Sequence, residues 1–218
     1  MKKQKRIQIN LGSGVVLAEG FINVDKFFTL KDLEKGAKTK KGLFANAVIP
    51  KNVKFVKADM CDLPFKNNYA DYIECSEVVE HLPMEDVFKV FSEIYRVLKP
   101  GGELGISTPD FDDLARLWTS KITGNKFSTQ KDWEVLKMLS QVIYGNQVGP
   151  GEFHKVPFNP IIIKQYLYAV GFEPEKIVVN VIPANSPYEP FQKTYKNYEE
   201  NWINKVNLTG SLWVTAIK

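Results

Sequence analysis

DYIECSEVVEHLPMEDVFKVFSEIYRVLKPGGELGIST, residues 71–108, has the apolar pattern of a strand, a helix and a second strand. Tyr72–Cys75 is a short and mostly apolar run. After Pro83, apolar residues recur at helical spacing, at Val87, Val90, Phe91, Ile94, Tyr95 and Leu98. Pro100, Gly101 and Gly102 then end the helix, and Leu104–Ile106 resumes a strand. This order predicts two parallel strands joined by a right-handed crossover helix.

The polar segments that follow these two strands are expected to form the functional edge of the sheet. They comprise residues 76–81 and residues 108–110. In sheets of this kind, ligands bind beyond the carboxyl ends of the parallel strands. Candidate site residues are therefore sought first in these two segments.

Further elements on both sides of this unit extend the alternation of strands and helices. Strands are expected at 6–11, 21–24, 53–57, 177–182 and 212–217. Helices are expected at 30–35, where Gly36 ends the helix, and at 111–122, 131–144 and 160–170. The order predicts an α/β, doubly wound, Rossmann-like fold. Its seven-stranded sheet is expected to be mostly parallel, with an antiparallel last strand.

Composition indicates one globular domain over residues 1–218. The chain is 44% hydrophobic and 25% charged, and its formal charge is only +4. Basic residues gather in 2–6 and 35–41, as is typical of solvated tails and loops, so nucleic acid is not expected as a partner. The two cysteines lack metal-ligand spacing, and no apolar run is long enough to cross a membrane. We expect a soluble, cytoplasmic protein without a metal site.

Three polar turns follow the first three predicted strands. INLGSG, residues 9–14, contains Gly12 and Gly14, which would let the backbone approach a ligand closely. A dinucleotide fingerprint needs a further glycine where this chain has Leu17. Asp25 could accept hydrogen bonds from both hydroxyls of a ribose, or it could cap a turn. Asp59 could bind an adenine amino group while Met60 packs on the ring, although Asp59 also suits a turn.

Taken in order, these motifs resemble those of the class I S-adenosylmethionine-dependent methyltransferases. The resemblance covers about residues 7–110, and EHL with RVLKPGG is its most specific part. INLGSG, GFINVD, SEVVEHL and STPD are similar to small predicted methyltransferases associated with polysaccharide and glycosyltransferase genes. The resemblance implies S-adenosylmethionine as cofactor. It implies that the methionine part, the ribose and the adenine are held by Asn10, Gly12, Gly14, Asp25, Asp59, Met60 and Ser76.

One departure from the family concerns the first crossover. Asp25 follows Gly14 by only 11 residues, and residues 15–21 lack helical periodicity. The first crossover helix is therefore expected to be reduced to a turn. A missing helix N-terminus would remove dipole stabilisation from the cofactor carboxylate, for which Lys26 could compensate.

Methylation of a hydroxyl needs alignment of the acceptor and removal of a proton, so the two histidines are candidate bases. His81 follows the fourth strand and could instead serve as a framework residue. His154 lies in a glycine- and proline-rich loop and could contact the acceptor or simply lie on the surface. Asp110 is a third candidate. Asp110, Asp112 and Asp113 could also form a metal cluster, but acidic residues are common in a first helical turn.

The absence of two motifs narrows the choice of acceptor. SEV, residues 76–78, replaces the proline turn of enzymes that methylate base amino groups, and no Pro-Cys nucleophile is present. The sequence therefore predicts a methyltransferase (EC 2.1.1.-) acting on an oxygen of a small molecule or saccharide. Residues 110–158 would form an acceptor-binding insertion, and residues 183–210 would connect the last two strands. The alternatives are a nicotinamide-dependent oxidoreductase and a non-catalytic nucleotide-binding protein of the same fold.

Overall fold

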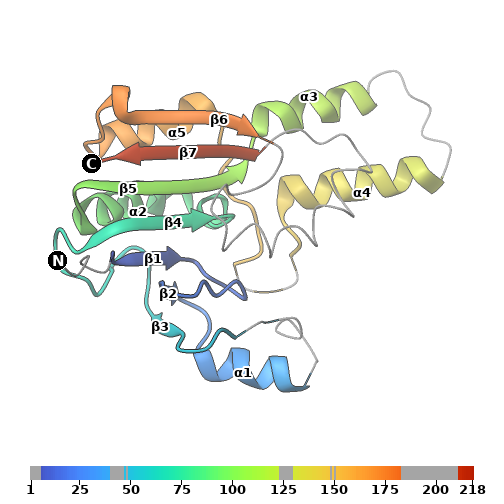
Figure 1. Cartoon of the computed structure of the whole chain (residues 1–218). Helices are drawn as coiled ribbons and strands as arrows, with labels where there is room; N and C mark the ends of the chain where they lie inside the picture. Colours follow the sequence, from blue (N-terminus) through green and yellow to red (C-terminus); the bar gives the residue numbers. More distant parts are fainter. Residues whose placement is uncertain are drawn as a thin grey trace.

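A seven-stranded mixed sheet forms the centre of the molecule in a computed structural model (Figure 1). The structure describes residues 6–39, 47, 49–122, 130–147, 149, 151–182 and 211–218. The strands are β1 (Gln8–Leu11), β2 (Ile22–Asp25), β3 (Lys54–Lys57), β4 (Ala70–Ser76), β5 (Leu98–Pro109), β6 (Ile177–Ile182) and β7 (Ser211–Ile217). Their order in the sheet is β3-β2-β1-β4-β5-β7-β6. The predicted doubly wound fold is confirmed.

Parallel pairing joins the strands from β3 to β5, whereas β7 is antiparallel to both of its neighbours. The antiparallel last strand is therefore confirmed. β1 and β4 lie at the centre of the sheet and supply fully buried side chains, among them Ile9, Leu11, Ile73 and Cys75. Such central strands read as almost continuous apolar runs because helices or loops cover both faces. The reversal of strand order beside β1 places the turns after β1 and β4 next to each other.

The helices divide between one face of the sheet and its carboxyl edge (Figure 1). α2 (Met84–Val97) and α5 (Pro160–Ala169) pack on one face. Val87, Val90, Phe91, Ile94 and Val97 form the fully buried stripe of α2. α3 (Phe111–Ile122) and α4 (Gln130–Tyr144) lie beyond the carboxyl ends of β4 and β5. The remaining helix, α1 (Leu30–Thr39), precedes β3, and short 3₁₀ turns, η1 (Val79–His81) and η2 (Pro174–Lys176), precede α2 and β6.

The first crossover contains no helix, as predicted. Residues 12–21 connect β1 to β2 through turns. Two buried asparagines hold this connection, because Asn10 Nδ2 donates to Asn23 Oδ1 at 2.9 Å and to the carbonyl oxygen of Val16 at 2.9 Å. Asn23 Oδ1 also accepts from the backbone nitrogen of Ala18 at 2.9 Å. Side-chain amides thus replace the backbone hydrogen bonds that a crossover helix would make.

Three local predictions were wrong. α1 continues to Thr39 instead of ending at Gly36, which is buried inside the helix. The segment 99–102 does not separate α2 from β5; β5 begins at Leu98 and contains this segment as an irregularity opposite residues 70–72. His81 lies in η1 instead of at the start of α2, because Pro83 precedes the first residue of that helix.

The edge strand β3 alternates between exposed and partly buried positions. Lys54 and Lys57 are exposed, and Phe55 and Val56 are partly buried. Lysines on an edge strand oppose pairing with another chain.

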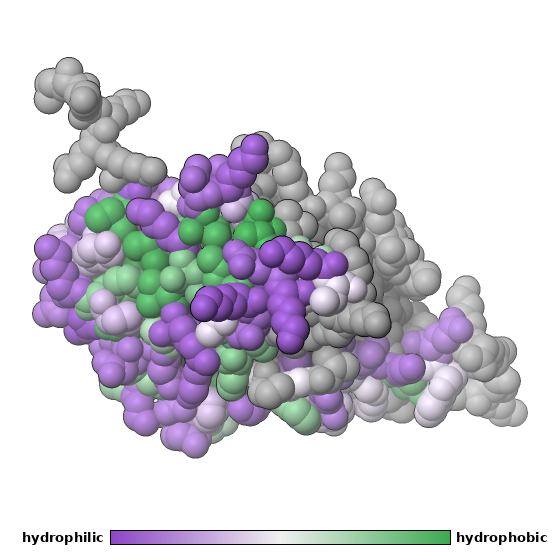
Figure 2. All heavy atoms as spheres, turned by 90° about the horizontal axis from the view of Figure 1, so that it is seen from below, coloured by the Kyte–Doolittle hydropathy of each residue, from purple (hydrophilic) through white to green (hydrophobic). Residues whose placement is uncertain are grey.

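The face shown in Figure 2 carries a hydrophobic area bordered by hydrophilic residues. None of the helices in the described part of the chain has the length and apolar character needed to cross a membrane.

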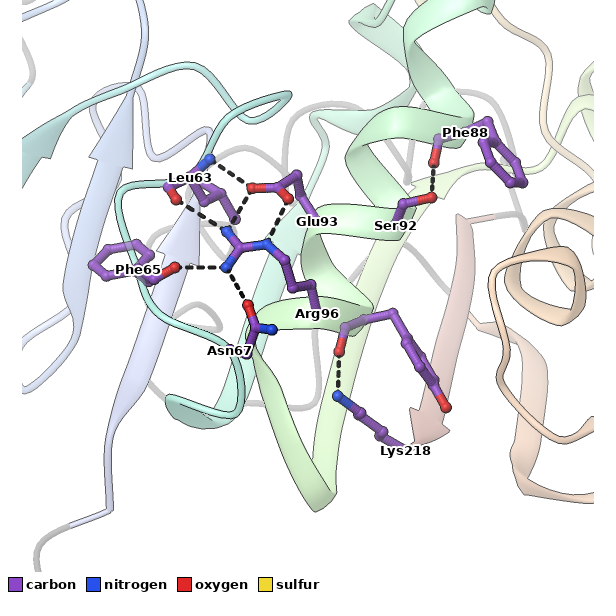
Figure 3. A network of polar contacts seen from close by, with 9 residues as sticks. Leu63, Phe65, Asn67, Phe88, Ser92, Glu93, Arg96 and Lys218 are labelled. Atoms are coloured by element: carbon purple, nitrogen blue, oxygen red, sulfur yellow. Dashed lines mark hydrogen bonds and ion pairs between the residues drawn. The ribbon is translucent and has the colours of Figure 1, made fainter.

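The connection between β3 and β4 is fastened to α2 by a network of polar contacts (Figure 3). Arg96 donates to the carbonyl oxygens of Phe65 at 2.7 Å and Leu63 at 3.1 Å. Glu93 Oε1 accepts from Arg96 Nε at 2.6 Å, and Glu93 Oε2 accepts from the backbone nitrogen of Leu63 at 2.8 Å. This network positions the segment that follows Asp59 and Met60.

Candidate active site

The two glycines of the turn after β1 have positive φ angles, +62° at Gly12 and +48° at Gly14. Their surroundings differ. A Cβ atom on Gly12 would lie 2.1 Å from Cγ2 of Val78, whereas a Cβ atom on Gly14 would meet nothing within 4 Å. Gly12 therefore allows the turn after β1 to pack against the turn after β4. Gly14 leaves open space where a ligand can approach the backbone.

Asp25 lies at the end of β2 and is buried, with 6% of its surface exposed. Its Oδ2 accepts from the backbone nitrogen of Gly14 at 2.9 Å, and its Oδ1 accepts from those of Phe27 at 2.8 Å and Phe28 at 3.3 Å. The carboxylate therefore links the glycine turn to the segment after β2. Its predicted contact with a ribose would use the lone pairs that these bonds leave.

Asp59 and Met60 follow β3, and Lys26 follows β2. Lys26 Nζ lies 2.6 Å from Asp59 Oδ2, and Asp59 Oδ1 accepts from the backbone nitrogen of Cys61 at 3.0 Å. The hydrogen bond from Lys26 lowers the pKa of Asp59. Met60 is 7% exposed. Lys26 is therefore paired at the predicted adenine side, not directed to the predicted position of the cofactor carboxylate.

Ser76 ends β4 within a buried polar chain. Its hydroxyl donates to Glu74, and Tyr72 donates to the same carboxyl group. Gly105 on β5 makes room for this chain, because a Cβ atom there would lie 2.4 Å from Tyr72 Oη and 2.7 Å from Glu74 Oε2. The hydroxyl of Ser76 is thus oriented by the sheet.

A buried atom of the glycine turn tests whether these residues fit a cofactor. Ser13 Oγ has no hydrogen-bond partner within the part of the chain that the structure describes. A buried hydroxyl usually has a partner, so an unpaired one marks a place where a polar ligand can add a hydrogen bond. Together with the open space at Gly14, this atom fits the predicted binding of a methionine moiety at the turn.

The two histidines meet although they are distant in the sequence. Their ring centroids lie 4.6 Å apart, nearly perpendicular. The loop after α4 is docked on η1, because the carbonyl oxygen of Glu80 accepts from the backbone nitrogens of Lys155 at 2.7 Å and Val156 at 3.2 Å. Gly145 is required here, since a Cβ atom would lie 1.9 Å from the carbonyl oxygen of Glu152. Both candidate bases therefore belong to one site.

Burial determines the charge of the imidazoles. It lowers the pKa of His81 to about 4, aided by His154 and Lys155, and it also lowers the pKa of His154. Nδ1 of His81 lies 3.1 Å from the carbonyl oxygen of Phe153. A neutral ring donates its proton to a carbonyl, so Nδ1 carries the proton and Nε2 keeps its lone pair.

The sequence interpretation missed two acidic residues, of which Glu80 lies beside both histidines and Glu77 lies beside Glu80. Glu80 is 2% exposed, and its Oε2 accepts from Thr108 Oγ1 at 3.0 Å. Glu77 Oε1 accepts from Ser107 Oγ at 2.9 Å. Burial raises the pKa of both carboxyl groups, and their proximity raises that of Glu80 further. The available signal was the position of Glu80 in EHL, the most specific part of the family resemblance.

A cavity of about 190 Å³ opens beside this cluster. Glu80 and His154 line it together with residues of β5, α3, α4 and the loop after α4, including Phe111, Leu114, Val142, Ile143 and Phe158. The cavity therefore combines apolar walls with ionisable groups, among them Glu80, His154 and Lys155, at the carboxyl edge of the sheet. This is a suitable composition for binding a small molecule.

The aspartates at the start of α3 have structural partners. Asp110, 3% exposed, accepts from the backbone nitrogen of Asp112 at 3.1 Å. Asp112 accepts from Asn159 Nδ2 at 3.1 Å, and Asp113 pairs with Arg116. Burial raises the pKa of Asp110. These contacts favour the role expected of acidic residues in a first helical turn.

Comparison with known proteins shows which proteins the chain resembles. The Methyltransferase domain family matches residues 12–106. A demethylmenaquinone methyltransferase of Staphylococcus epidermidis is 28% identical over 130 residues, covering 55% of this chain and 53% of that protein. A sterol 24-C-methyltransferase of Schizosaccharomyces pombe is 44% identical over 52 residues, covering 24% of this chain and 13% of that protein. The matched part of the chain thus spans about half of the length of the first relative and much less of the second.

Solved structures share the fold over nearly the whole chain. An S-adenosylmethionine-dependent methyltransferase from Mesorhizobium loti has a TM-score of 0.57 at 16% identity, covering 100% of this chain and 93% of that one. Another such methyltransferase, from Archaeoglobus fulgidus, has a TM-score of 0.53 at 18% identity, covering 99% of this chain and 87% of that one. Residues 12–106 thus match a methyltransferase domain, and the chain shares the fold of S-adenosylmethionine-dependent methyltransferases.

Proposed function

We propose that this protein transfers a methyl group from S-adenosylmethionine to an oxygen of a small molecule or saccharide. The observation that carries the proposal is the cavity lined by Glu80 and His154 at the carboxyl edge of the sheet. Its lining includes Pro109 at the end of β5 and Glu80 in η1, which follows β4. Methyl transfer to a hydroxyl needs a group that receives a proton, and the cavity offers one.

The cofactor would lie across the turns after β1, β2, β3 and β4. Asn10, Gly12, Gly14 and Ser76 are proposed for the methionine part, Asp25 for the ribose, and Asp59 with Met60 for the adenine. Asn10 acts by holding the turn, since its amide donates to Asn23 and Val16. The open space at Gly14 and the unpaired Ser13 hydroxyl support this arrangement.

The acceptor would occupy the cavity. His154 lines it and is proposed to receive the hydroxyl proton as the methyl group transfers, while His81 packs against His154 and orients its ring. Asp110 helps to hold the start of α3, which forms part of the wall. The oxygen of the bound acceptor and the methyl carbon of S-adenosylmethionine would then be aligned for an in-line displacement.

Titration with S-adenosylhomocysteine tests cofactor binding. We expect Asp59→Asn to weaken binding roughly tenfold, because the adenine amino group would then donate to a neutral amide oxygen instead of a charged carboxylate. Asp62→Asn, three residues further along the same loop, is the matched control and should bind like wild type. Thermal shifts with S-adenosylhomocysteine and NAD distinguish this function from the oxidoreductase alternative. No binding at about millimolar concentration would contradict the proposal.

The second candidate is methylation of a carbon atom, which the name of the sterol 24-C-methyltransferase favours. Incubation with methyl-labelled S-adenosylmethionine and panels of saccharides, small alcohols and quinones separates the two. The carbon chemical shift of the transferred methyl group distinguishes a methyl ether from a carbon-bound methyl group. A product methylated only at carbon would refute the oxygen assignment while leaving the class of enzyme intact.

A further inference from the structure

Glu80, His81 and His154 bring three metal-ligand groups to one point. Each offers one ligand atom, and these atoms all lie within 4.8 Å of one another. Glu80 and His81 are adjacent in η1, whereas His154 reaches them from the loop after α4. The backbone bonds from Lys155 and Val156 to Glu80 hold the two segments together, so the convergence is a product of the fold.

Every member of the cluster has one polar atom held by the surrounding protein. His81 Nδ1 donates to the carbonyl oxygen of Phe153, and the imidazole of His154 is hydrogen-bonded to the backbone of Val142. Glu80 Oε2 accepts from Thr108. Metal-binding histidines commonly donate their second ring nitrogen to a backbone carbonyl, and ligating carboxylates are themselves hydrogen-bonded. The cluster shows the same outer contacts on all three side chains.

The remaining carboxylate oxygen supplies an independent observation. Only 2% of the surface of Glu80 is exposed. Its Oε1 atom is buried and has no hydrogen-bond partner among the described residues. Leaving a buried carboxylate oxygen unpaired is costly, and each such atom in a native fold requires an explanation. A cation between Glu80 and the two imidazoles would provide the missing partner.

We propose that Glu80, His81 and His154 bind one divalent transition-metal ion, with Zn²⁺ as the representative ion. Two imidazole nitrogens and one carboxylate oxygen suit Zn²⁺ and similar ions, whereas Mg²⁺ and Ca²⁺ prefer oxygen ligands. Three protein ligands leave a coordination position open. Glu80 and His154 line the cavity, so that position would be accessible from it.

The role of the ion rests on the proposed function, although its binding does not. In the loaded protein, His154 would be a ligand of the ion, so the acceptor hydroxyl would bind at the open coordination position and release its proton to solvent as the methyl group transfers. Without an ion, the unpaired oxygen of Glu80 would have no ligand to bind. A chain that has this metal site and a chain that lacks it would differ in Zn²⁺ affinity, which can be measured without any acceptor.

The test is calorimetric titration of chelator-treated, tag-free protein with Zn²⁺, since a histidine tag would itself bind the metal. We expect one ion per chain. We also expect binding to weaken at least about tenfold in Glu80→Gln, His81→Ala and His154→Ala, because each variant removes one ligand. Glu152→Gln removes a carboxylate from the same loop as His154 and should bind like wild type. Substitution with Co²⁺ should give absorption typical of nitrogen and oxygen ligands, which disappears in His154→Ala.

Two results would overturn the proposal. One is no Zn²⁺ binding by the wild-type chain at about 0.1 mM. The other is unchanged affinity in His154→Ala. Glu80 is buried, so the Glu80→Gln variant could fail to fold. The His154→Ala variant, at a half-buried position, then decides the outcome, and circular dichroism checks that it is folded. Retained binding of S-adenosylhomocysteine with no Zn²⁺ binding would reject the metal site alone, whereas loss of both would reject the proposed function as well.

Discussion

Two glycines in one turn have different physical roles. Both Gly12 and Gly14 have positive φ angles, which L side chains adopt at a cost. Only Gly12 lies against another side chain, that of Val78 after β4. The sequence pattern predicts a close approach of the backbone, but it does not distinguish contact with the protein from contact with a ligand.

Gly12→Ala should lower the free energy of unfolding by about 2–4 kcal/mol, because left-handed strain adds to overlap with Val78. Gly14→Ala should cost about 1–2 kcal/mol, because it has the strain without the overlap. Urea denaturation of both variants measures the difference. Equal losses would show that contact with Val78 does not determine the choice of glycine at position 12. Gly14→Ala should also weaken S-adenosylhomocysteine binding if the open space holds the cofactor.

At the scale of elements, α2 does more than cover the sheet. Its inner stripe is buried against the strands, and Glu93 and Arg96 on a second side hold the connection between β3 and β4 (Figure 3). Arg96 is partly buried, so its hydrogen bonds to backbone carbonyls are more valuable than those of an exposed ion pair. Helical periodicity predicts the inner stripe, whereas the polar network depends on where the connection lies.

The Glu93 network should make stability depend on pH. The hydrogen bond from Arg96 lowers the pKa of Glu93 from its usual 4.5, so its stabilisation is complete above that value. This stabilisation is lost as the pH falls through the folded-state pKa. Glu93→Gln should therefore lower the free energy of unfolding by about 1–2 kcal/mol at neutral pH, and by less in acid.

Denaturant unfolding across this pH range checks the expectation. Glu85→Gln, at an exposed position in the first turn of the same helix, is the matched control and should change stability little at any pH. A constant deficit for Glu93→Gln from neutral to acid pH would be incompatible with a stabilising ionised carboxylate.

At the scale of the whole molecule, Lys218 joins the end of β7 to α2 and β5. Its Nζ donates to the carbonyl oxygens of Tyr95 at 2.7 Å and Leu98 at 2.8 Å, and to Asn68 Oδ1 at 2.9 Å. The ammonium lies 4.6 Å from the centre of the Tyr95 ring. Carbonyls at a helix C-terminus lack partners in their own helix, and a cation there is favoured by the helix dipole.

Lys218→Met should lower the free energy of unfolding by about 1–2 kcal/mol, because two partly buried carbonyl oxygens and the exposed Asn68 Oδ1 lose their donor. Lys176→Met removes an exposed lysine paired only with Glu173 three residues away, and should have little effect. Thermal and urea unfolding of the two variants provide the comparison. Similar losses would mean that Lys218 contributes no more than a surface lysine.

Predictions based on the spacing of apolar residues were confirmed where the whole pattern lies within one segment of the chain. The strands, the amphipathic α2 and the absent first crossover helix are of this kind, because spacing of apolar residues is a local property. Helix ends were less predictable. Gly36 can end an isolated helix, but its burial within α1 shows that packing continues the helix past it.

By itself, the sequence determined the fold class, the resemblance to methyltransferases and the segments that follow the strands of the parallel sheet, since these depend on periodicity and on motifs along the chain. Only the tertiary structure decided which side chains meet there. Glu80 meets both histidines because the loop after α4 docks on η1 and brings His154 to His81. Such convergence depends on contacts between distant segments, and no local pattern encodes the distance between them.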